Sequence, residues 1–406
     1  MNLVKSAAKL SVTPARPRRV QWQSRRGRDG PGAPARKDFD VTQSLIGTDK
    51  FELDTPILCI DLEAMDSNLR KMADFISSRG KQWRPHMKCH KTPTIALRQI
   101  AAGAIGVTCA KVSEAEVMAA AGIRDLLIAN MIVGPRKLER VVSLCRTADP
   151  IVTCDHYAQV EPLAAACCRN GVACRAIVEV NVGLDRVGIR PGRETVDLAE
   201  GIDRLAGVEM VGIMGYEGHL LQVADPQEKR MKIQEAMGIL EHCRDVILKK
   251  GMCCDIVSAA GTGSYQITAD QPVVTELQCG GGIFGDPMYR LKCGLTGMEP
   301  ALTVLATVVS RPMIERAILD SGRKTVNGDI QIPLVKGLPD AEVTKLSAEH
   351  GWLALGPKSR DVKIGDKLEL IVGYADFTTV LHDEFYVFRG NRLEAVWPIA
   401  ARGMLQ

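Results

Sequence analysis

The chain has 406 residues, of which 46% are hydrophobic and 25% are charged, and its formal net charge is +4. These values match ordinary soluble proteins and exceed the size of a single average domain. No apolar run reaches about 18 residues, which excludes a membrane-spanning helix. The sequence therefore predicts a large α/β domain with a smaller companion.

The positive charge lies in the first 37 residues, which hold ten Lys or Arg and one acidic residue, Asp29. A segment so rich in Pro, Gly and Ser cannot bury a core, so residues 1–40 are predicted to be a disordered extension. It could be an organellar transit segment, a nucleic-acid-binding arm, or a functionless extension translated from an upstream start codon. We favour the last, because Trp22 is the lone aromatic residue among the basic ones. No nucleic-acid partner and no export are expected.

The cysteines indicate a reducing compartment. There are thirteen, an odd number, and none are spaced as Cys-x-x-Cys. Two adjacent pairs, Cys167 with Cys168 and Cys253 with Cys254, are typical of small buried side chains rather than of disulfides or a zinc cluster. A cytoplasmic location is therefore expected.

From residue 83 the chain repeats a short apolar run, a polar or Gly-rich turn and an amphipathic helix. Strands that alternate with helices form a parallel sheet, and eight such units form a TIM-type (β/α)8 barrel. In such a barrel the active site lies at the carboxyl ends of the strands. The predicted strands are 83–88, 105–110, 125–131, 151–155, 175–182, 209–216, 255–260 and 275–280.

Several helix boundaries between these strands can be read from the sequence. Ser113 and Glu116 form a predicted capping box, and Gly122 is expected to end that helix in a left-handed conformation. Pro135 is expected to open the next helix, and residues 227–250 carry apolar side chains at helical spacing.

After about residue 300 the long helices stop, and strands separated by Gly and Asp turns are predicted. This pattern indicates a mainly β domain over residues 299–406, after a barrel over residues 63–298. The segment 41–62 is expected to lead into the barrel and to contribute a strand to the β domain. The predicted β-domain strands are 302–309, 316–320, 367–372, 382–388 and 393–397.

The segment Arg84-Pro85-His86-Met87-Lys88-Cys89-His90-Lys91 lies where the first barrel strand would end. A partly desolvated lysine at such a strand end is a nucleophile toward aldehydes, of which pyridoxal phosphate is the commonest in proteins. The alternative is that Lys88 and Lys91 are surface charges at the start of a helix.

Further polar residues follow other predicted strands. The run Gly261-Thr262-Gly263-Ser264 follows strand seven, where backbone N–H groups, hydroxyls and the start of a helix could hold a phosphate. The alternative is a tight turn. Arg186 follows strand five directly after Asp185, and the alternative there is an exposed ion pair that contributes little.

Several motifs together resemble the D-threonine aldolase and D-serine dehydratase family, which are fold type III pyridoxal phosphate enzymes with an alanine racemase-like barrel. The resemblance runs in order from about residue 54 to residue 403. The matching motifs are Arg84 to Lys91, Lys111-Val112-Ser113-Glu114-Ala115, Val182-Gly183-Leu184-Asp185-Arg186-Val187-Gly188, Gly261 to Ser264, Thr275-Glu276-Leu277-Gln278 and Trp397-Pro398-Ile399-Ala400-Ala401-Arg402-Gly403.

The resemblance implies a role for each matching residue. Lys88 would form the Schiff base with pyridoxal 5'-phosphate, and Arg186 would meet the phenolate oxygen of the cofactor. Tyr216 would line the site, and Lys91 would be an ordinary surface charge. Relatives form dimers, so a homodimer is expected. The phosphate would be bound by Gly261, Thr262, Gly263 and Ser264. The loop after strand eight departs from the family, because Gly280, Gly281 and Gly282 stand where relatives tend to carry a hydroxyl or aromatic side chain. These glycines could widen the pocket or enlarge the backbone cradle of the cofactor, and Gly280 is taken as a cofactor-binding residue.

The chain departs from the family at the divalent metal (Mg, Mn or Zn), for which relatives use a His-x-Asp or His-x-Cys pair. Here Tyr374 occupies the histidine position and precedes Asp376 by two residues. A phenol is a poor ligand beside one carboxylate, so metal binding at Asp376 is doubtful. Asp376 could still hold magnesium through water, or Tyr374 could act as an acid or base itself.

The resemblance implies a lyase that cleaves a D-3-hydroxy-amino acid, such as D-threonine or 3-hydroxy-D-aspartate, to glycine and an aldehyde or oxo acid. Candidate bases for the hydroxyl proton are His219, Tyr374 and His86, although a lone His or Tyr is more often structural. A D-serine or 3-hydroxyaspartate dehydratase is the first alternative, which loss of the metal-binding histidine disfavours. An amino-acid racemase that uses Lys88 and Tyr374, and a pyridoxal phosphate-binding protein without turnover, are the others.

Overall fold

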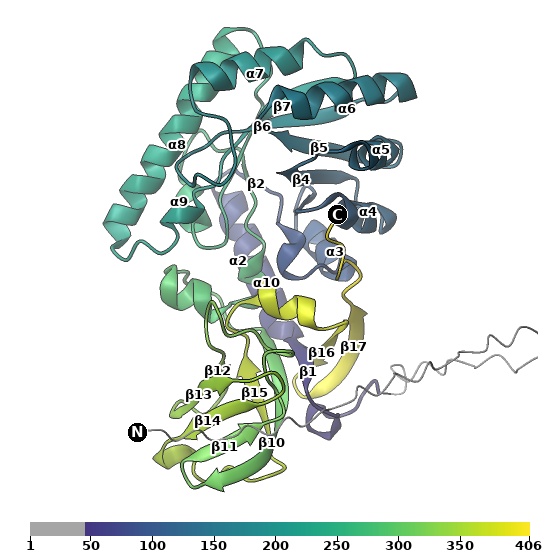
Figure 1. The fold of residues 1–406 in the computed structure, drawn as a ribbon. Helices are drawn as coiled ribbons and strands as arrows, with labels where there is room; N and C mark the ends of the chain where they lie inside the picture. The colour runs from purple at the N-terminus through teal and green to yellow at the C-terminus, as the bar shows by residue number, and fades with distance from the viewer. Residues whose placement is uncertain (1–44) are drawn as a thin grey trace, which may run out of the picture. The chain divides into compact units, whose positions relative to one another are not determined.

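The computed structural model describes residues 45–406. The predicted extension over residues 1–40 lies outside the described residues, as does the start of the segment 41–62. The described chain forms one parallel and one largely antiparallel sheet (Figure 1). Within residues 45–406 no helix is both long and apolar enough to cross a membrane.

The parallel sheet is the predicted barrel, so the fold class is confirmed. Its strand order is β2-β9-β8-β7-β6-β5-β4-β3. Backbone hydrogen bonds join the two edges, because Ile105 donates to Trp83 O and Thr108 donates to Pro85 O, both at 2.9 Å. The strands are β2 (Gln82–Trp83), β3 (Val107–Cys109), β4 (Asp125–Met131), β5 (Asp149–Cys154), β6 (Cys174–Glu179), β7 (Val208–Met214), β8 (Ile256–Ala259) and β9 (Glu276–Leu277).

Helices surround these strands, as Figure 1 shows. Pro135 opens α5 as predicted, and Gly122 follows α4 with a φ of +90°. The helix predicted after Ser264 is a single turn, α9 (Tyr265–Thr268). The longer helices are α2 (Leu62–Ser78), α3 (Pro93–Ala101), α4 (Val112–Ala120), α5 (Pro135–Leu144), α6 (Tyr157–Asn170), α7 (Arg193–Asp203) and α8 (Pro226–Lys249).

The capping box predicted from Ser113 and Glu116 is wrong, because α4 begins one residue before Ser113. Glu114 caps the helix instead, and its Oε2 accepts the N–H groups of Ala110 at 2.6 Å and Lys111 at 3.1 Å. Glu116 is free to pair with Arg140 on the neighbouring helix α5. The N-cap residue is therefore Lys111, and the buried Glu114 carboxylate three residues later binds the first N–H groups of α4.

Charged side chains fill the end of the barrel at which the strands begin. The Arg84 side chain is 1% exposed and its Nε lies 3.0 Å from both carboxylate oxygens of Glu276. Its Nη1 lies 2.8 Å from Asp125 Oδ1, which also pairs with Arg175 at 2.6 Å. Arg84 therefore links β9 to β4 across the barrel interior.

The second sheet has the order β11-β14-β13-β12-β15-β10-β1-β16-β17, and β10 also pairs with β11. All five strands predicted after residue 300 are present, and the early strand β1 (Ile57–Asp61) pairs with β10 and β16. β12, β13 and β14 were not predicted. The strands are β10 (Leu302–Met313), β11 (Arg316–Leu319), β12 (Leu334–Val335), β13 (Ala341–Leu346), β14 (Gly351–Leu355), β15 (Lys367–Ile371), β16 (Glu384–Arg389) and β17 (Arg392–Pro398).

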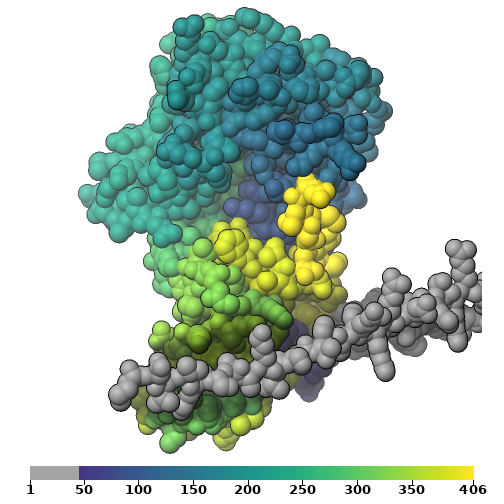
Figure 2. All heavy atoms as spheres, viewed as in Figure 1, coloured from purple at the N-terminus to yellow at the C-terminus, as the bar shows by residue number. Residues whose placement is uncertain are grey.

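The segment after β17 lies against the barrel. Ala401 donates its N–H to Lys91 O at 3.0 Å, and Ser113 donates its N–H to Gln406 O at 2.9 Å. In Figure 2 this yellow segment covers blue barrel residues. The short helix α10 (Ala375–Thr378), which follows β15, also contacts the barrel beside Lys88. The β domain thus contributes to the mouth of the barrel.

Candidate active site

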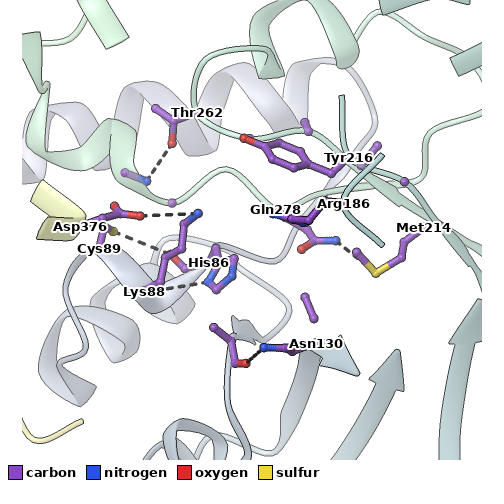
Figure 3. Close-up of a pocket in the computed structure, with 18 of the residues that line it drawn as sticks. His86, Lys88, Cys89, Asn130, Arg186, Met214, Tyr216, Thr262, Gln278 and Asp376 are labelled. Atoms are coloured by element: carbon purple, nitrogen blue, oxygen red, sulfur yellow. Dashed lines mark hydrogen bonds and ion pairs between the residues drawn. The ribbon is translucent and has the colours of Figure 1, made fainter. Parts of the chain in front are cut away.

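A cavity of about 420 Å³ lies at the carboxyl ends of the barrel strands (Figure 3). Segments after six strands contribute to its wall, together with α10 of the β domain. The sequence-predicted site residues that line it are His86, Lys88, Arg186, Tyr216, Gly261, Thr262, Gly280 and Asp376.

Lys88 lies in a short 3-10 helix, Met87–Cys89, rather than in the first strand as predicted. The strand ends at Trp83, and Pro85, which has no N–H to donate, follows soon after. The Lys88 side chain is 42% exposed and points toward the β domain in Figure 3. Its Nζ lies 3.5 Å from Asp376 Oδ2, so the amine faces a carboxylate across the cavity.

His86 lies beside this lysine and is uncharged. Its Nδ1 accepts the N–H of Lys88 at 3.3 Å. Burial, together with the charges of Lys88, Lys91 and Arg186, holds the pKa of His86 well below its usual value. The ring is therefore a neutral acceptor at Nδ1 near pH 7.

Arg186 and Tyr216 form the opposite part of the wall. The Arg186 guanidinium lies 5.6 Å from the centre of the Tyr216 ring, within range of a cation–π contact. Its Nη2 lies 3.9 Å from Glu179 Oε1, so Arg186 has a partner other than the neighbouring Asp185. Burial raises the pKa of Tyr216, which keeps its hydroxyl protonated.

Glu179 gives a testable pH dependence. Burial raises its pKa from 4.5 to about 7, while Arg186 opposes the shift and Asp155 adds to it. Between these two values the folded protein binds a proton that the unfolded chain does not, so the free energy of unfolding falls as pH rises. Because of Glu179, we expect the free energy of unfolding of the wild-type protein to fall by on the order of 2 kcal/mol between pH 5 and pH 8. The variant Glu179→Gln should lack this decrease. Urea denaturation at both pH values measures this change in unfolding free energy. If the change between pH 5 and pH 8 were the same in Glu179→Gln as in the exposed control Glu209→Gln, the prediction would be wrong.

Glycines bring the backbone close to the cavity at the end near Thr262. A Cβ on Gly261 would lie 2.9 Å from the Tyr216 ring, and one on Gly280 would lie 2.1 Å from His86 O. Thr262 Oγ1 accepts the N–H of Gly281 at 2.9 Å and joins the loops after β8 and β9. We call this end of the cavity, lined by Gly261, Thr262 and Gly280, the backbone cradle, and the resemblance implies that the phosphate binds here.

Four predicted site residues lie outside the lining of this cavity. Gly263 and Ser264 instead line a second cavity of about 350 Å³ on the other side of their loop. The His219 ring packs against Gly183, where a Cβ would lie 2.8 Å from its Nε2. Tyr374 reaches the cavity indirectly, because its hydroxyl donates to Asp376 Oδ2 at 3.1 Å.

The residues at Asp376 do not fit the metal that the resemblance implied. Burial and the nearby Asp376 carboxylate raise the pKa of Tyr374, so its phenol stays protonated and acts as a donor. A protonated phenol and one carboxylate are a poor donor set for Mg²⁺, Mn²⁺ or Zn²⁺. Among residues 45–406, no three His, Cys, Asp or Glu side chains are grouped to hold a metal ion.

Lys91 is not the surface charge that was predicted. It is 7% exposed and has a φ of +51°. Its Nζ pairs with the buried carboxylate of Glu114, the same group that caps α4. Lys91 therefore joins the turn after Lys88 to α4, the second helix after it in the chain.

Sequence reasoning missed several polar residues around the cavity. Asp286 is fully buried, its Oδ2 accepts the N–H of Ala375 at 2.8 Å, and burial raises its pKa. Tyr289 lines the cavity wall, with its ring centre 5.9 Å from that of Tyr374. Gln278, quoted above only as part of a motif, lines the cavity and donates to Ser258 Oγ at 2.9 Å. No local sequence signal marked Asp286, because the β-domain residue that it binds, Ala375, lies 89 positions later in the chain.

This combination of a parallel barrel, a lysine at its mouth and an antiparallel β domain defines an alanine racemase-like protein. Residues 60–287 match the family described as alanine racemase, N-terminal domain, and residues 301–388 match the family described as putative serine dehydratase domain. The chain belongs to the D-threonine aldolase and D-serine dehydratase family, whose cofactor is pyridoxal phosphate.

Relatives match nearly the whole length of the chain. It is 36% identical to D-threonine aldolase of Arthrobacter sp over 86% of this chain and 93% of the relative. It is 32% identical to 3-hydroxy-D-aspartate aldolase of Paracoccus denitrificans, strain Pd 1222, over 90% of this chain and 96% of the relative. A crystal structure of D-threonine aldolase from Filomicrobium marinum superposes with a TM-score of 0.86 at 35% identity, over 89% of this chain and 98% of that one.

Proposed function

We propose that this protein is a pyridoxal phosphate-dependent aldolase that cleaves a D-3-hydroxy-amino acid to glycine and an aldehyde or oxo acid. The supporting observation is the order of similarity among relatives. Aldolases match at 32% and 36% identity, whereas D-threo-3-hydroxyaspartate dehydratase of Delftia sp. and D-serine dehydratase of Dictyostelium discoideum match at 27% and 24%. The dehydratase activity is therefore the second candidate.

The cavity residues fit the cofactor. When bound, pyridoxal phosphate supplies an aldehyde that joins amines covalently and a ring that accepts the electron pair of a breaking bond. Lys88 offers the amine, and the backbone around Gly261, Thr262 and Gly280 offers the phosphate cradle. Arg186, positioned by Tyr216 and Glu179, offers a positive charge for the phenolate oxygen.

Asp376 is the group proposed to accept the proton of the substrate's β-hydroxyl. Its Oδ2 faces Lys88 Nζ in the cavity, whereas its Oδ1 is buried and has no hydrogen-bond partner among residues 45–406. The Tyr374 hydroxyl holds the carboxylate in this orientation. Lys88 and Asp376 together can then hold and move one proton at the reacting end of the cavity.

Replacing Asp376 tests this assignment. In Asp376→Asn we expect kcat to fall about 100-fold, because general-base catalysis is lost. Pyridoxal phosphate affinity should change little, since the phosphate cradle and Lys88 remain. The matched control is Asp383→Asn, whose side chain is 80% exposed. A large loss of cofactor affinity with unchanged kcat would instead give Asp376 a structural role.

The activity itself is tested with purified protein and D-threonine, D-serine or 3-hydroxy-D-aspartate. Glycine plus an aldehyde or oxo acid supports the aldolase. Ammonia plus a keto acid identifies a dehydratase, an inverted amino acid identifies a racemase, and absence of product identifies a binding protein. Parallel reactions with manganese or EDTA test the metal, and the donor set at Asp376 predicts equal rates in both.

We also propose a homodimer in a reducing compartment such as the cytoplasm. All thirteen cysteines are free and ten are buried, which fits that environment. Light scattering of the purified protein measures the oligomeric state.

A further inference from the structure

The buried lysine Lys229 is not part of the site described above. It lies near the start of α8, is 5% exposed, and its pKa is lowered by burial. Its Nζ donates to Leu221 O at 2.8 Å and to Gly263 O and Cys293 O at 2.7 Å. An ammonium group has three N–H donors, so main-chain carbonyls use all of them.

The three carbonyls come from three different loops at the barrel mouth. Leu221 follows β7, Gly263 follows β8, and Cys293 lies beyond β9. These loops are already close, because a Cβ on Gly263 would lie 3.0 Å from Cys293 Cβ and 3.2 Å from Leu221 Cδ2. Lys229 therefore joins three loops at one point, with short charge-assisted hydrogen bonds.

The loop held through Gly263 is the one that forms the backbone cradle. Its two faces border different cavities: Gly261 and Thr262 line the active-site cavity, whereas Lys229, Gly263 and Ser264 line the second one. Thr262 lines both. Lys229 thus lies on the side of this loop that faces away from the active-site cavity. From there it cannot touch the cofactor or substrate, but it can set the position of the loop.

Burying an ammonium group costs free energy unless its donors are well satisfied. Neutral side chains could fill the same volume, but they would not bind three carbonyls at once. We propose that Lys229 is a positioning residue that holds the Gly261–Ser264 loop in the shape that binds the cofactor's phosphate. This inference rests on the proposed function, since it requires pyridoxal phosphate in the cavity.

The test compares two aldehydes that differ only in the phosphate. Wild-type protein and Lys229→Met are titrated with pyridoxal phosphate and with pyridoxal, and binding is followed by absorbance. In Lys229→Met we expect the Kd for pyridoxal phosphate to rise at least about tenfold. The Kd for pyridoxal should change less than about threefold, because pyridoxal does not use the cradle. Lys232→Met, on the same helix and 45% exposed, is the matched control.

Other outcomes overturn the inference. If Lys229→Met lost equal affinity for both aldehydes, Lys229 would support the fold generally. If the affinity for both were unchanged, the loop would hold its shape without Lys229. If Lys229→Met does not fold, Lys229→Gln, which keeps two donors, should show a smaller loss that is still selective for the phosphorylated aldehyde. A wild-type protein that binds neither aldehyde would overturn the proposed function as well, whereas selective failure of the variants concerns Lys229 alone.

Discussion

Replacement of Lys88 by alanine is expected to abolish both the absorbance band of the imine at Lys88 and the activity. An imine between the Lys88 amine and the cofactor's aldehyde absorbs visible light, and alanine has no amine with which to form it. We expect the activity to fall by at least about 10³-fold, because no other lysine lines the cavity described in residues 45–406. An absorbance spectrum and the rate of glycine formation measure the two effects.

The control for this experiment is Lys71→Ala, which removes an exposed lysine that pairs with Glu299. It should remain yellow and active. Borohydride reduction of the wild-type protein should label one peptide, and that peptide should span Lys88. A coloured, active Lys88→Ala variant, or a label on another lysine, would assign the covalent bond elsewhere and remove the basis of the proposed function.

The barrel could be predicted from the sequence because each repeat carries its own local signals. A parallel strand buried on both faces is a short apolar run, and the turns and helix starts around it are marked by Gly and Pro. The β domain was predicted incompletely. β13 carries a bulge between Val343 and Lys345, which interrupts the alternation of buried and exposed residues that identifies a strand.

The site was predictable where a residue's chemistry follows from its place in the repeat. Lys88, Arg186 and Thr262 each follow a strand, and strand ends meet at the barrel mouth. Lys91 was misplaced because a lysine near a helix start is usually exposed, and only the tertiary structure brings Glu114 to it. Asp286 and Tyr289 were missed for the same reason: nothing local shows that the β domain buries them beside Asp376.

Arg84 is expected to stabilise the barrel, a role that its motif did not indicate because the chemistry of the motif pointed to Lys88. We expect Arg84→Met to lower the free energy of unfolding by about 3–5 kcal/mol. The substitution leaves Glu276, which is 3% exposed, as a buried carboxylate without its guanidinium partner. Urea denaturation measures the change.

Arg140→Met is the matched control for the effect of burial, because it breaks a similar ion pair that is more exposed. Arg140 also binds a carboxylate with two nitrogens, Nε at 2.7 Å and Nη2 at 2.6 Å from Glu116, but both side chains are about a third exposed. We expect Arg140→Met to lower the free energy of unfolding by less than about 1 kcal/mol. Adding Glu276→Leu to Arg84→Met should recover much of the lost stability, because the unpaired carboxylate is then removed. Equal effects of the two arginine substitutions would mean that water reaches the base of the barrel, and that its charges do not link β9 to β4.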